Sequence, residues 1–311
     1  MDGTEYKDDN MIKKIKYLFD YFKYLKNPFS ALLFKFGQKK EVELKIKSTN
    51  KTVKVNDVDI LNNFMSRIPN IQIDKHSEFM EYINDVCEDK EVVKINGINF
   101  INVLNKNFKK QNSNKYHVDY EEFFTGDEWD MVPLNNRHVI DIGANVADSP
   151  LYFAKGNANV IAFEPVKHLY ELGIKNISLN PKLKDKIIFI NKAVGGKRGK
   201  MNINTKSTEN YINSEDSYKI EVITIPDVIN MYNFKPDILK MDCEGCEFEI
   251  ILNYNLNMFN DIIFEHHTAI TGIDYNQLID KLKKQGFKID KYCCNNCPGE
   301  FKDIGIIHAY K

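Results

Sequence analysis

A glycine turn between two acids stands out in residues 138–154, HVIDIGANVADSPLYFA. An apolar run carries Asp141 near its end, Gly143 follows, and Asp148 opens a helical pattern. In an open α/β sheet, ligands bind beyond the carboxyl ends of strands. A helix that begins there presents free N–H groups and a partial positive charge, and glycine allows backbone angles that other residues avoid. The segment therefore predicts a ligand site, and its buried acid suits a ligand that also carries a cation.

The turn lacks the glycines of a dinucleotide site. A NAD-binding turn reads Gly-x-Gly-x-x-Gly, whereas this one reads Gly-Ala-Asn-Val-Ala-Asp from Gly143 onward. A pyrophosphate would lose its close approach to the backbone. A ligand with a carboxylate, an ammonium and a sulfonium but no phosphate fits better, and S-adenosylmethionine has these groups. Asp148 or Ser149 can cap the helix, and Pro150 suits its first turn.

A further acid, Glu164, ends the next apolar run, 21 residues after Gly143. At this spacing an acid typically accepts hydrogen bonds from the ribose hydroxyls of a nucleoside. Each feature alone could be a structural strand end. Together, with a parallel sheet behind them, they predict binding of a nucleoside cofactor.

The segment PDILKMDCEGCEFEIIL, residues 236–252, repeats the arrangement of an apolar run, an acid and a glycine. The run ends in Asp242, and Glu244 and Gly245 follow before a helical pattern. Because parallel strands end at the same edge of a sheet, we expect Asp242 to lie beside the Gly143 turn.

These motifs resemble the FkbM family of S-adenosylmethionine-dependent methyltransferases. The resemblance rests on VIDIGANVADSPLYFA, VIAFEP, NISLN, NKAVGG, LKMDCEGCEFEI and IIFEHH, and it covers roughly residues 115–311. Its most specific part is the Asp-x-Glu-Gly-x-Glu element that begins at Asp242.

The resemblance implies a class I methyltransferase fold, with a seven-stranded sheet ordered 3-2-1-4-5-7-6. It also implies O-methylation of a hydroxyl on a sugar, a glycolipid or a secondary metabolite. Glu164 would hold the ribose, and Asp242 and Glu244 would lie at the reaction centre. Ala147 departs from the family, which often has glycine there. The cofactor-binding residues implied are Asp141, Gly143, Ala144, Asn145, Asp148, Glu164 and Asp242.

Methyl transfer from a sulfonium is an in-line displacement, so the protein must align the acceptor and remove its proton. Alignment can supply about 7–11 kcal/mol and a positioned base about 10²–10⁴-fold. The candidate bases are Asp242, Glu265 and His267, and we favour His267, because His266 should face the other side of the strand. Glu244, with these three, could instead collect a divalent metal, although we predict none.

The elements that must position these residues alternate along the second part of the chain. Short apolar runs separated by helical patterns are typical of a doubly wound, mostly parallel sheet. The last two strands have no helix between them and should form an antiparallel hairpin at one edge. The predicted strands are 138–142, 159–163, 187–190, 220–224, 237–241, 261–264, 287–292 and 304–310.

The earlier part of the chain has a different pattern. We divide the chain into an N-terminal α+β accessory region, residues 1–110, and a methyltransferase-like domain, residues 111–311. The predicted elements of the first region are helices over residues 11–36 broken at Asn27-Pro28, hairpins over 41–55 and 91–103 with the second turned at Asn96-Gly97, and a polar linker or loop over 106–115.

Cysteines occur in two C-x-x-C pairs, Cys243 with Cys246 and Cys294 with Cys297, and Cys293 lies beside the second. Structural zinc sites usually place about 15–20 residues between such pairs, whereas 47 lie between these. We therefore predict reduced thiols.

The 311 residues are 43% hydrophobic, and the formal net charge of −1 gives no electrostatic case for nucleic acid binding. Neither a long apolar run nor a signal-peptide pattern occurs, so we expect a soluble, cytoplasmic protein. The expected partner is a small-molecule or glycan acceptor. Lysines beside Phe19 and Phe22 could also make a weak contact with an anionic membrane, or the helix could pack on the main domain.

One rival to an active enzyme is a cofactor-binding or interaction protein of the same fold whose methyltransferase activity has been lost. The intact acids Asp141, Glu164, Asp242 and Glu244 argue against this loss, whereas Ala147 favours it. The missing glycines disfavour a NAD oxidoreductase.

Overall fold

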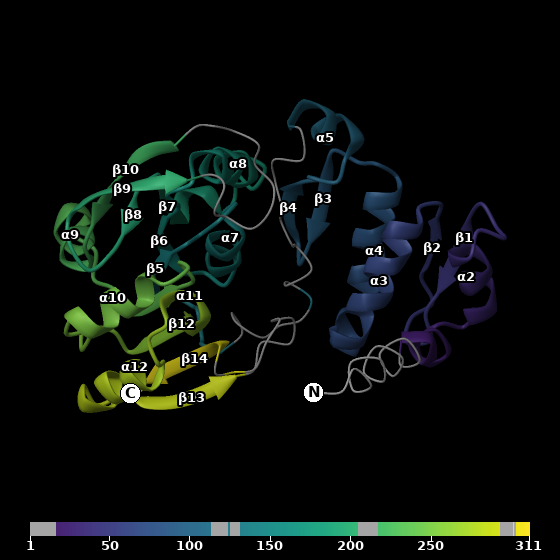
Figure 1. The fold of residues 1–311 in the computed structure, drawn as a ribbon. Coiled ribbons are helices and arrows are strands. Elements are labelled where there is room, and N and C mark those ends of the chain that lie inside the picture. Colours follow the sequence, from purple (N-terminus) through teal and green to yellow (C-terminus); the bar gives the residue numbers. More distant parts are fainter. Residues whose placement is uncertain (1–16, 113–123, 125–130, 205–216, 293–300, 302) are drawn as a thin grey trace. The chain divides into compact units, whose positions relative to one another are not determined.

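The computed structural model describes residues 17–112, 124, 131–204, 217–292, 301 and 303–311 (Figure 1). None of the helices within these ranges is long and apolar enough to cross a membrane. The chain divides into two compact units, Met1–Ser113 with Asp119–Gly126, and Asn114–Val118 with Asp127–Lys311.

The first unit contains short helices and two hairpins. Both predicted hairpins are confirmed, since β1 pairs with β2 and β3 with β4, each antiparallel. Asn96 and Gly97 have φ of 48° and 72°, as a two-residue type I′ turn requires. The elements are a helix over residues 17–24, α2 (Pro28–Lys35), β1 (Val42–Lys45), β2 (Thr52–Val55), α3 (Val58–Arg67), α4 (His76–Cys87), β3 (Val92–Ile95), β4 (Ile98–Ile101) and α5 (Lys106–Asn112).

Two predictions about helix ends fare differently in this unit. The predicted break at Asn27-Pro28 is confirmed, because α2 begins at Pro28 after a separate helix, and the residue before a proline disfavours helical angles. The predicted polar linker over residues 106–115 is wrong in its first part, where α5 forms. Asn105 Oδ1 accepts a hydrogen bond from the Phe108 amide at 3.0 Å, as an N-cap does. Residues 113–115 lie outside the described ranges.

The second unit is built on a seven-stranded sheet ordered β7-β6-β5-β11-β12-β14-β13 (Figure 1). Numbered along the chain, this is the predicted order 3-2-1-4-5-7-6, so the class I methyltransferase fold is confirmed. β14 runs antiparallel to both its neighbours, as the predicted edge hairpin requires. The strands are β5 (His138–Ile142), β6 (Asn159–Phe163), β7 (Ile187–Ile190), β11 (Ile238–Met241), β12 (Asp261–His267), β13 (Lys288–Tyr292) and β14 (Ile304–Tyr310).

Helices connect these strands and cover the sheet. The central strands β5, β6 and β11 are buried along nearly their whole length, which explains their apolar sequences. The helices of this unit are α7 (Asp148–Lys155), α8 (Lys167–Ser178), α9 (Ile225–Tyr232), α10 (Cys246–Asn253), α11 (Thr268–Thr271) and α12 (Asn276–Lys284).

One predicted strand lies in a different sheet. We expected residues 220–224 in the main sheet, but β10 (Ser217–Ile223) pairs with β8 (Ala193–Val194) and β9 (Gly199–Asn204) in a separate three-stranded sheet. The reason lies in the side chains. Ile220 packs in a small apolar cluster, whereas Glu221 is exposed. Such alternation suits a sheet with one solvated face rather than a strand buried on both faces.

Candidate active site

The turn between β5 and α7 lies directly against β11. Gly143 has φ of +78°, and a Cβ atom added there would lie 1.7 Å from the carbonyl oxygen of Asp242. Only glycine can take both this angle and this close approach. The close approach expected from the sequence therefore exists, but its partner is the neighbouring strand end. As predicted, Asp242 lies beside the Gly143 turn.

The helix that follows is capped differently from our prediction. Its N-cap is Ala147, in the left-handed conformation with φ of 63° and without a side-chain hydrogen bond, so capping by Asp148 or Ser149 is wrong. The Ser149 hydroxyl instead donates to Asp141 Oδ2 at 2.7 Å. Pro150 lies in the first turn, as predicted. Because an L-residue costs about 1–2 kcal/mol in the left-handed region, the angle at Ala147 also explains why glycine suits this position.

Three acids around the turn are buried: Asp141, Asp148 and Glu164. Burial disfavours a charged carboxylate. It therefore raises the pKa of Asp148 to about 6 and that of Glu164 to about 8, and it raises the pKa of Asp141 as well.

Lys240, which the sequence reasoning missed, opposes this effect. It lies in β11 directly across from Asp141, and its Nζ is 3.5 Å from Asp141 Oδ1. The same nitrogen donates to the Gly143 carbonyl at 3.1 Å and lies 4.0 Å from Asp242 Oδ2. A single lysine in an otherwise apolar run was the available signal.

Glu164 accepts hydrogen bonds from the segments that follow β5 and β6. Its Oε2 accepts from the Asn145 amide at 2.9 Å, and its Oε1 accepts from the Val166 amide at 2.7 Å. The amides of Gly143 and Ala144 both donate to the Phe163 carbonyl. These three amides of the turn are therefore used within the protein, and the expectation that the turn offers free N–H groups fails for them.

The turn instead offers acceptors. Asp141 Oδ1 and Asn145 Oδ1 are buried, and neither has a hydrogen-bond partner among the described residues. Leaving a buried polar atom unpaired costs about 1–3 kcal/mol. A ligand ammonium would supply the missing donors. These atoms therefore fit the amino group of S-adenosylmethionine.

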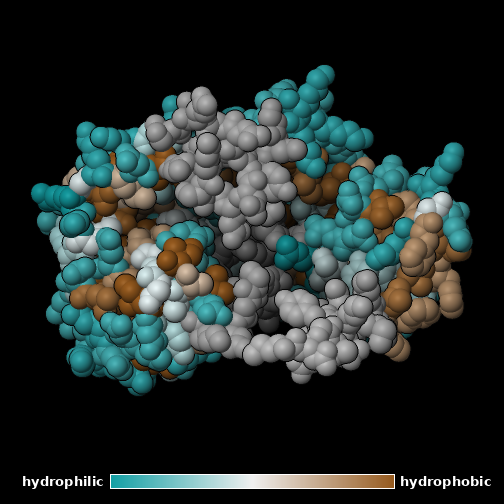
Figure 2. Space-filling view, in the orientation of Figure 1, coloured by the Kyte–Doolittle hydropathy of each residue, from teal (hydrophilic) through white to brown (hydrophobic). Residues whose placement is uncertain are grey.

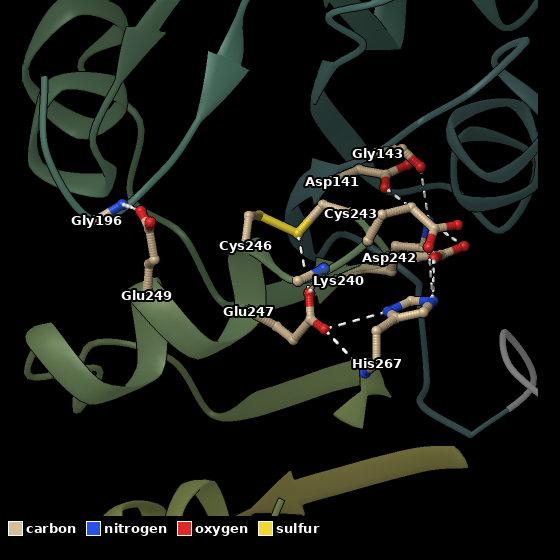
Figure 3. The surroundings of a disulfide bond; sticks show 12 residues. Asp141, Gly143, Gly196, Lys240, Asp242, Cys243, Cys246, Glu247, Glu249 and His267 are labelled. Carbon is tan, nitrogen blue, oxygen red and sulfur yellow. Dashed lines mark hydrogen bonds and ion pairs between the residues drawn. A yellow bond between two sulfur atoms is a disulfide. The ribbon is translucent and has the colours of Figure 1, made fainter. Parts of the chain in front are cut away.

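The four predicted catalytic residues come together at the ends of β11 and β12, around the ring of His267. Figure 3 shows Asp242 beside this ring. Its Nε2 lies 3.4 Å from Glu244 Oε2, 3.5 Å from Glu265 Oε2 and 4.0 Å from Asp242 Oδ1. His266 faces the other side, as strand alternation predicts, where its ring stacks on Tyr275 at 4.5 Å.

Glu247 fixes the other side of this ring and was also missed. Fully buried, it accepts hydrogen bonds through Oε1 from the amide and from Nδ1 of His267, each at 3.1 Å (Figure 3). Its Oε2 accepts from the Gly245 amide at 3.0 Å. The signal was its place as the last acid of the Asp-x-Glu-Gly-x-Glu element.

The surroundings of His267 argue against the role of base that we favoured. Burial lowers its pKa, but the hydrogen bond to Glu247 and the charges of Glu244, Glu247 and Asp242 outweigh burial and raise the pKa of His267 to about 9. At neutral pH the ring then carries a proton and accepts none. Asp242 and Glu265 stay as candidate bases.

Cys243 and Cys246 form a disulfide directly beside this cluster (Figure 3). Our prediction of reduced thiols is wrong for this pair. Between them, Glu244 and Gly245 have φ of 55° and 114°, and the chain turns back so that the two cysteine Cα atoms lie 5.5 Å apart, a normal disulfide separation. Cys293, Cys294 and Cys297 lie outside the described ranges.

Residues 141–289 match the methyltransferase FkbM domain. The chain is therefore similar to the FkbM family of methyltransferases over these residues, a little under half of its length. The match confirms the predicted resemblance over a shorter range than 115–311. It also confirms S-adenosylmethionine as the cofactor that the family implies. No curated protein matches the chain in sequence.

Several solved structures resemble the chain at low sequence identity. Methyltransferase FkbM from Methylobacillus flagellatus KT has 12% identity and a TM-score of 0.44, and the match covers 81% of this chain and 59% of that one. Precorrin-6y C5,15-methyltransferase from Geobacter metallireducens GS-15 has 12% identity and a TM-score of 0.38, with 72% and 96% covered. TrmK from M. capricolum, solved with S-adenosyl-homocysteine, has 14% identity and a TM-score of 0.35, with 57% and 64% covered.

Proposed function

We propose that this protein is an S-adenosylmethionine-dependent O-methyltransferase acting on a hydroxyl of a sugar, a glycolipid or a secondary metabolite. The observation that carries the proposal is a pair of buried acceptors at the turn beside Glu164, neither of which has a hydrogen bond among the described residues. Asn145 Oδ1 is one, and Asp141 Oδ1, which has only its 3.5 Å ion-pair contact with Lys240, is the other. The carboxylates around His267 lie at the next strand end and supply an acceptor site next to this turn.

Each end of the cofactor has a partner in this arrangement. Asp141 and Asn145 accept from its ammonium group. Glu164 holds the ribose, because a carboxylate has about four lone-pair sites and two backbone amides use only two of them.

The residues near His267 act on the acceptor. S-adenosylmethionine supplies an electrophilic methyl group on a sulfonium. The acceptor hydroxyl oxygen forms the bond to that methyl carbon while the carbon–sulfur bond breaks, and its electron pair stays on sulfur. Asp242 or Glu265 takes the hydroxyl proton. Alignment by these side chains can lower the barrier by about 7–11 kcal/mol. Proton removal by a positioned base accelerates the reaction about 10²–10⁴-fold, which is the smaller contribution.

Binding of S-adenosylhomocysteine tests the cofactor site. We expect micromolar affinity by calorimetry, and at 100 times the dissociation constant a stabilisation of about 2.7 kcal/mol. Glu164→Gln and Asp141→Asn should each weaken binding at least tenfold. Glu171→Gln, on an exposed position of α8, is the matched control, and NAD should give no shift.

No stabilisation at millimolar S-adenosylhomocysteine would sink the proposal. Incubation with a labelled methyl donor and extracts of the source cells, followed by mass spectrometry, then identifies the acceptor. Binding without any labelled product would indicate instead a cofactor-binding protein that has lost catalysis.

Exposed apolar side chains in the first unit support a second, weaker partner, a membrane surface. In the first helix, Phe19 is 68% and Phe22 41% exposed, and α2 exposes Phe29 to 70%. Figure 2 shows apolar surface over this part of the first unit. Lysines lie between these side chains in the sequence. Apolar and basic side chains on one helix favour a weak contact with an anionic membrane.

A further inference from the structure

We propose that Asp242, Glu244, Glu265 and His267 bind one divalent cation, Mn²⁺ or Mg²⁺, which holds the acceptor oxygen beside the methyl donor. The role of the cation rests on the proposed function. Its binding is a separate property of these four side chains.

The donor atoms are spaced as ligands of one ion. The ligand atoms of Asp242, Glu244 and His267 all lie within 4.8 Å of one another. From His267 Nε2, the carboxylate oxygens of the other three residues lie at 3.4, 3.5 and 4.0 Å. An octahedral ion with bonds of about 2.1 Å places neighbouring ligands about 3 Å and opposite ligands about 4.2 Å apart. Small rotations of the side chains therefore complete the site.

The His267 ring is oriented by a hydrogen bond of the kind that metal-binding histidines make. A ligating histidine almost always gives its other ring N–H to a carboxylate or carbonyl, which fixes its orientation. Here Glu247 accepts from Nδ1 at 3.1 Å, and Nε2 is directed into the cluster (Figure 3). Among the contacts of the described residues, Nε2 makes ion-pair contacts only, while the side chain is 4% exposed. A buried nitrogen fixed in this way is an independent sign of a ligand.

The charges around the ring also favour a cation. Four carboxylates surround one imidazole: Asp242, Glu244, Glu247 and Glu265. The nearest lysine, Lys240, is closer to Asp141 than to Asp242. Like charges this close repel one another strongly in a partly buried site. The proton on the His267 ring offsets part of that repulsion. A divalent ion bound at Nε2 would displace this proton and offset more of the repulsion with its two charges.

The donor set selects the kind of ion. Carboxylate oxygens suit Mg²⁺ and Mn²⁺, and a single imidazole is compatible with Mn²⁺. The sulfur atoms of Cys243 and Cys246 are joined in a disulfide, so neither of them is a thiolate that would favour zinc. Glu244 is 67% exposed, which gives a hydrated ion access.

Such an ion would define the class of acceptor. A bound cation lowers the pKa of a hydroxyl or water that it ligates. The acceptor hydroxyl would give its proton to an oxygen of Asp242 or Glu265 that does not bind the ion, and the hydroxyl oxygen would remain fixed for attack on the methyl carbon. A substrate with a second oxygen next to that hydroxyl, such as a vicinal diol, could bind the ion through both atoms.

Mn²⁺ binding to the full chain, followed by electron paramagnetic resonance without any cofactor, tests the proposal. We expect one Mn²⁺ per chain and competition by Mg²⁺. Glu244→Gln and Glu265→Gln should each weaken Mn²⁺ binding at least tenfold. Because the Glu244 side chain is exposed, Glu244→Gln should leave the fold unchanged. Glu249→Gln in α10, the helix that follows Glu244, is the matched control, since Glu249 contacts Gly196 and lies outside the cluster (Figure 3). This change should alter the affinity less than twofold.

Glu247→Gln should weaken Mn²⁺ binding about 10–100-fold, the usual effect of removing the partner of a ligating histidine. The proposal would be overturned if the native chain bound no Mn²⁺, or if Glu244→Gln and Glu265→Gln bound Mn²⁺ with the same affinity as the native chain. Calorimetry with S-adenosylhomocysteine in the presence of a chelator separates the two ideas. Retained cofactor binding without Mn²⁺ binding leaves the methyltransferase proposal standing and removes only the ion.

Discussion

Glu164 is a buried carboxyl that two backbone amides hold in place. Burial dominates, and it raises the pKa of Glu164 to about 8. A group whose pKa is raised in the folded state stabilises the fold fully below its unfolded pKa. That contribution is lost as pH rises through the folded pKa.

The free energy of unfolding of the native chain should therefore fall, relative to that of Glu164→Gln, between about pH 4.5 and pH 8. The relative slope can reach about 1.4 kcal/mol per pH unit for one proton. Urea unfolding of both proteins at several pH values measures it. Burial raises the pKa of Asp148 to about 6 in the native chain, and its charge raises the pKa of Glu164. Its own contribution is common to both proteins, and its coupling to Glu164 stays in the difference. A difference independent of pH would show that Glu164 is ionised throughout.

Asp242 links the two halves of the site, since it lies 4.0 Å from both His267 Nε2 and Lys240 Nζ. Asp242→Asn keeps the size of the side chain at a strand end that is 35% exposed, so the fold should persist. Methyl transfer should fall about 10²-fold or more, through loss of a base or of a ligand. Labelled methyl transfer to the identified acceptor measures the change. Near-normal turnover would move the chemistry to Glu265.

The sequence allowed all predicted catalytic residues to be placed at neighbouring strand ends, because parallel strands end at one edge. It did not reveal what pairs with them. Lys240 matters because the sheet register sets it opposite Asp141, and Glu247 matters because α10 turns it onto His267. Both contacts join residues whose relation depends on register or helix rotation, which apolar patterns do not specify.

At the scale of elements, the β5–α7 turn contains three residues with positive φ, Gly143, Asn145 and Ala147. The first and the last of them should tolerate substitution differently. Gly143→Ala should lower the free energy of unfolding by about 3 kcal/mol, from left-handed strain of about 1–2 kcal/mol and a clash with the Asp242 carbonyl of about 1–3 kcal/mol. Ala147→Gly is the reverse change, four residues further along the chain. It relieves backbone strain, which stabilises the fold, but it removes a buried methyl group and makes the unfolded chain more flexible, which destabilises the fold. We expect a change of less than about 1 kcal/mol.

Urea unfolding of the two variants checks this contrast. S-adenosylhomocysteine should bind Ala147→Gly like the native chain, which would show that the missing glycine does not impair the site. Equal destabilisation by both changes would contradict the role assigned to Gly143, since strain alone would then account for both.

The charged residues at the starts of the central strands are paired, in contrast to some acceptors at the carboxyl ends of these strands. Arg137 donates to Asp237 and, at 2.6 Å, to Asp261, so one guanidinium joins the starts of β5, β11 and β12. These charges are paired with one another, whereas at the other edge Asn145 Oδ1 is buried without a hydrogen-bond donor among the described residues. Alternation identified the strands of the main sheet, but it did not assign β10 to its own sheet or foresee the disulfide, because both depend on how the backbone turns.

At the scale of the whole molecule, the two compact units have separate cores. In the first unit, Phe64 stacks on Phe79 with ring centroids 5.4 Å apart. A large apolar cluster of the second unit contains only residues between Ile140 and Ala309. Motifs matched to a family identified the second unit from the sequence. The first unit matched no motif, so its hairpins were predicted from alternation alone, and its function was not.

This separation predicts that residues 111–311 fold without the rest, although residues 119–126 of this fragment belong to the first unit. Every residue assigned to the cofactor lies within that range, as does the cluster that supports their strands. The fragment should therefore bind S-adenosylhomocysteine within about threefold of the full chain, or about 0.65 kcal/mol. Calorimetry on both proteins measures this, and Glu164→Gln in the fragment serves as the control that should lose binding. An aggregated fragment, or one that binds more than tenfold more weakly, would show that the first unit stabilises the cofactor site and that the boundary near residue 110 is not a functional one.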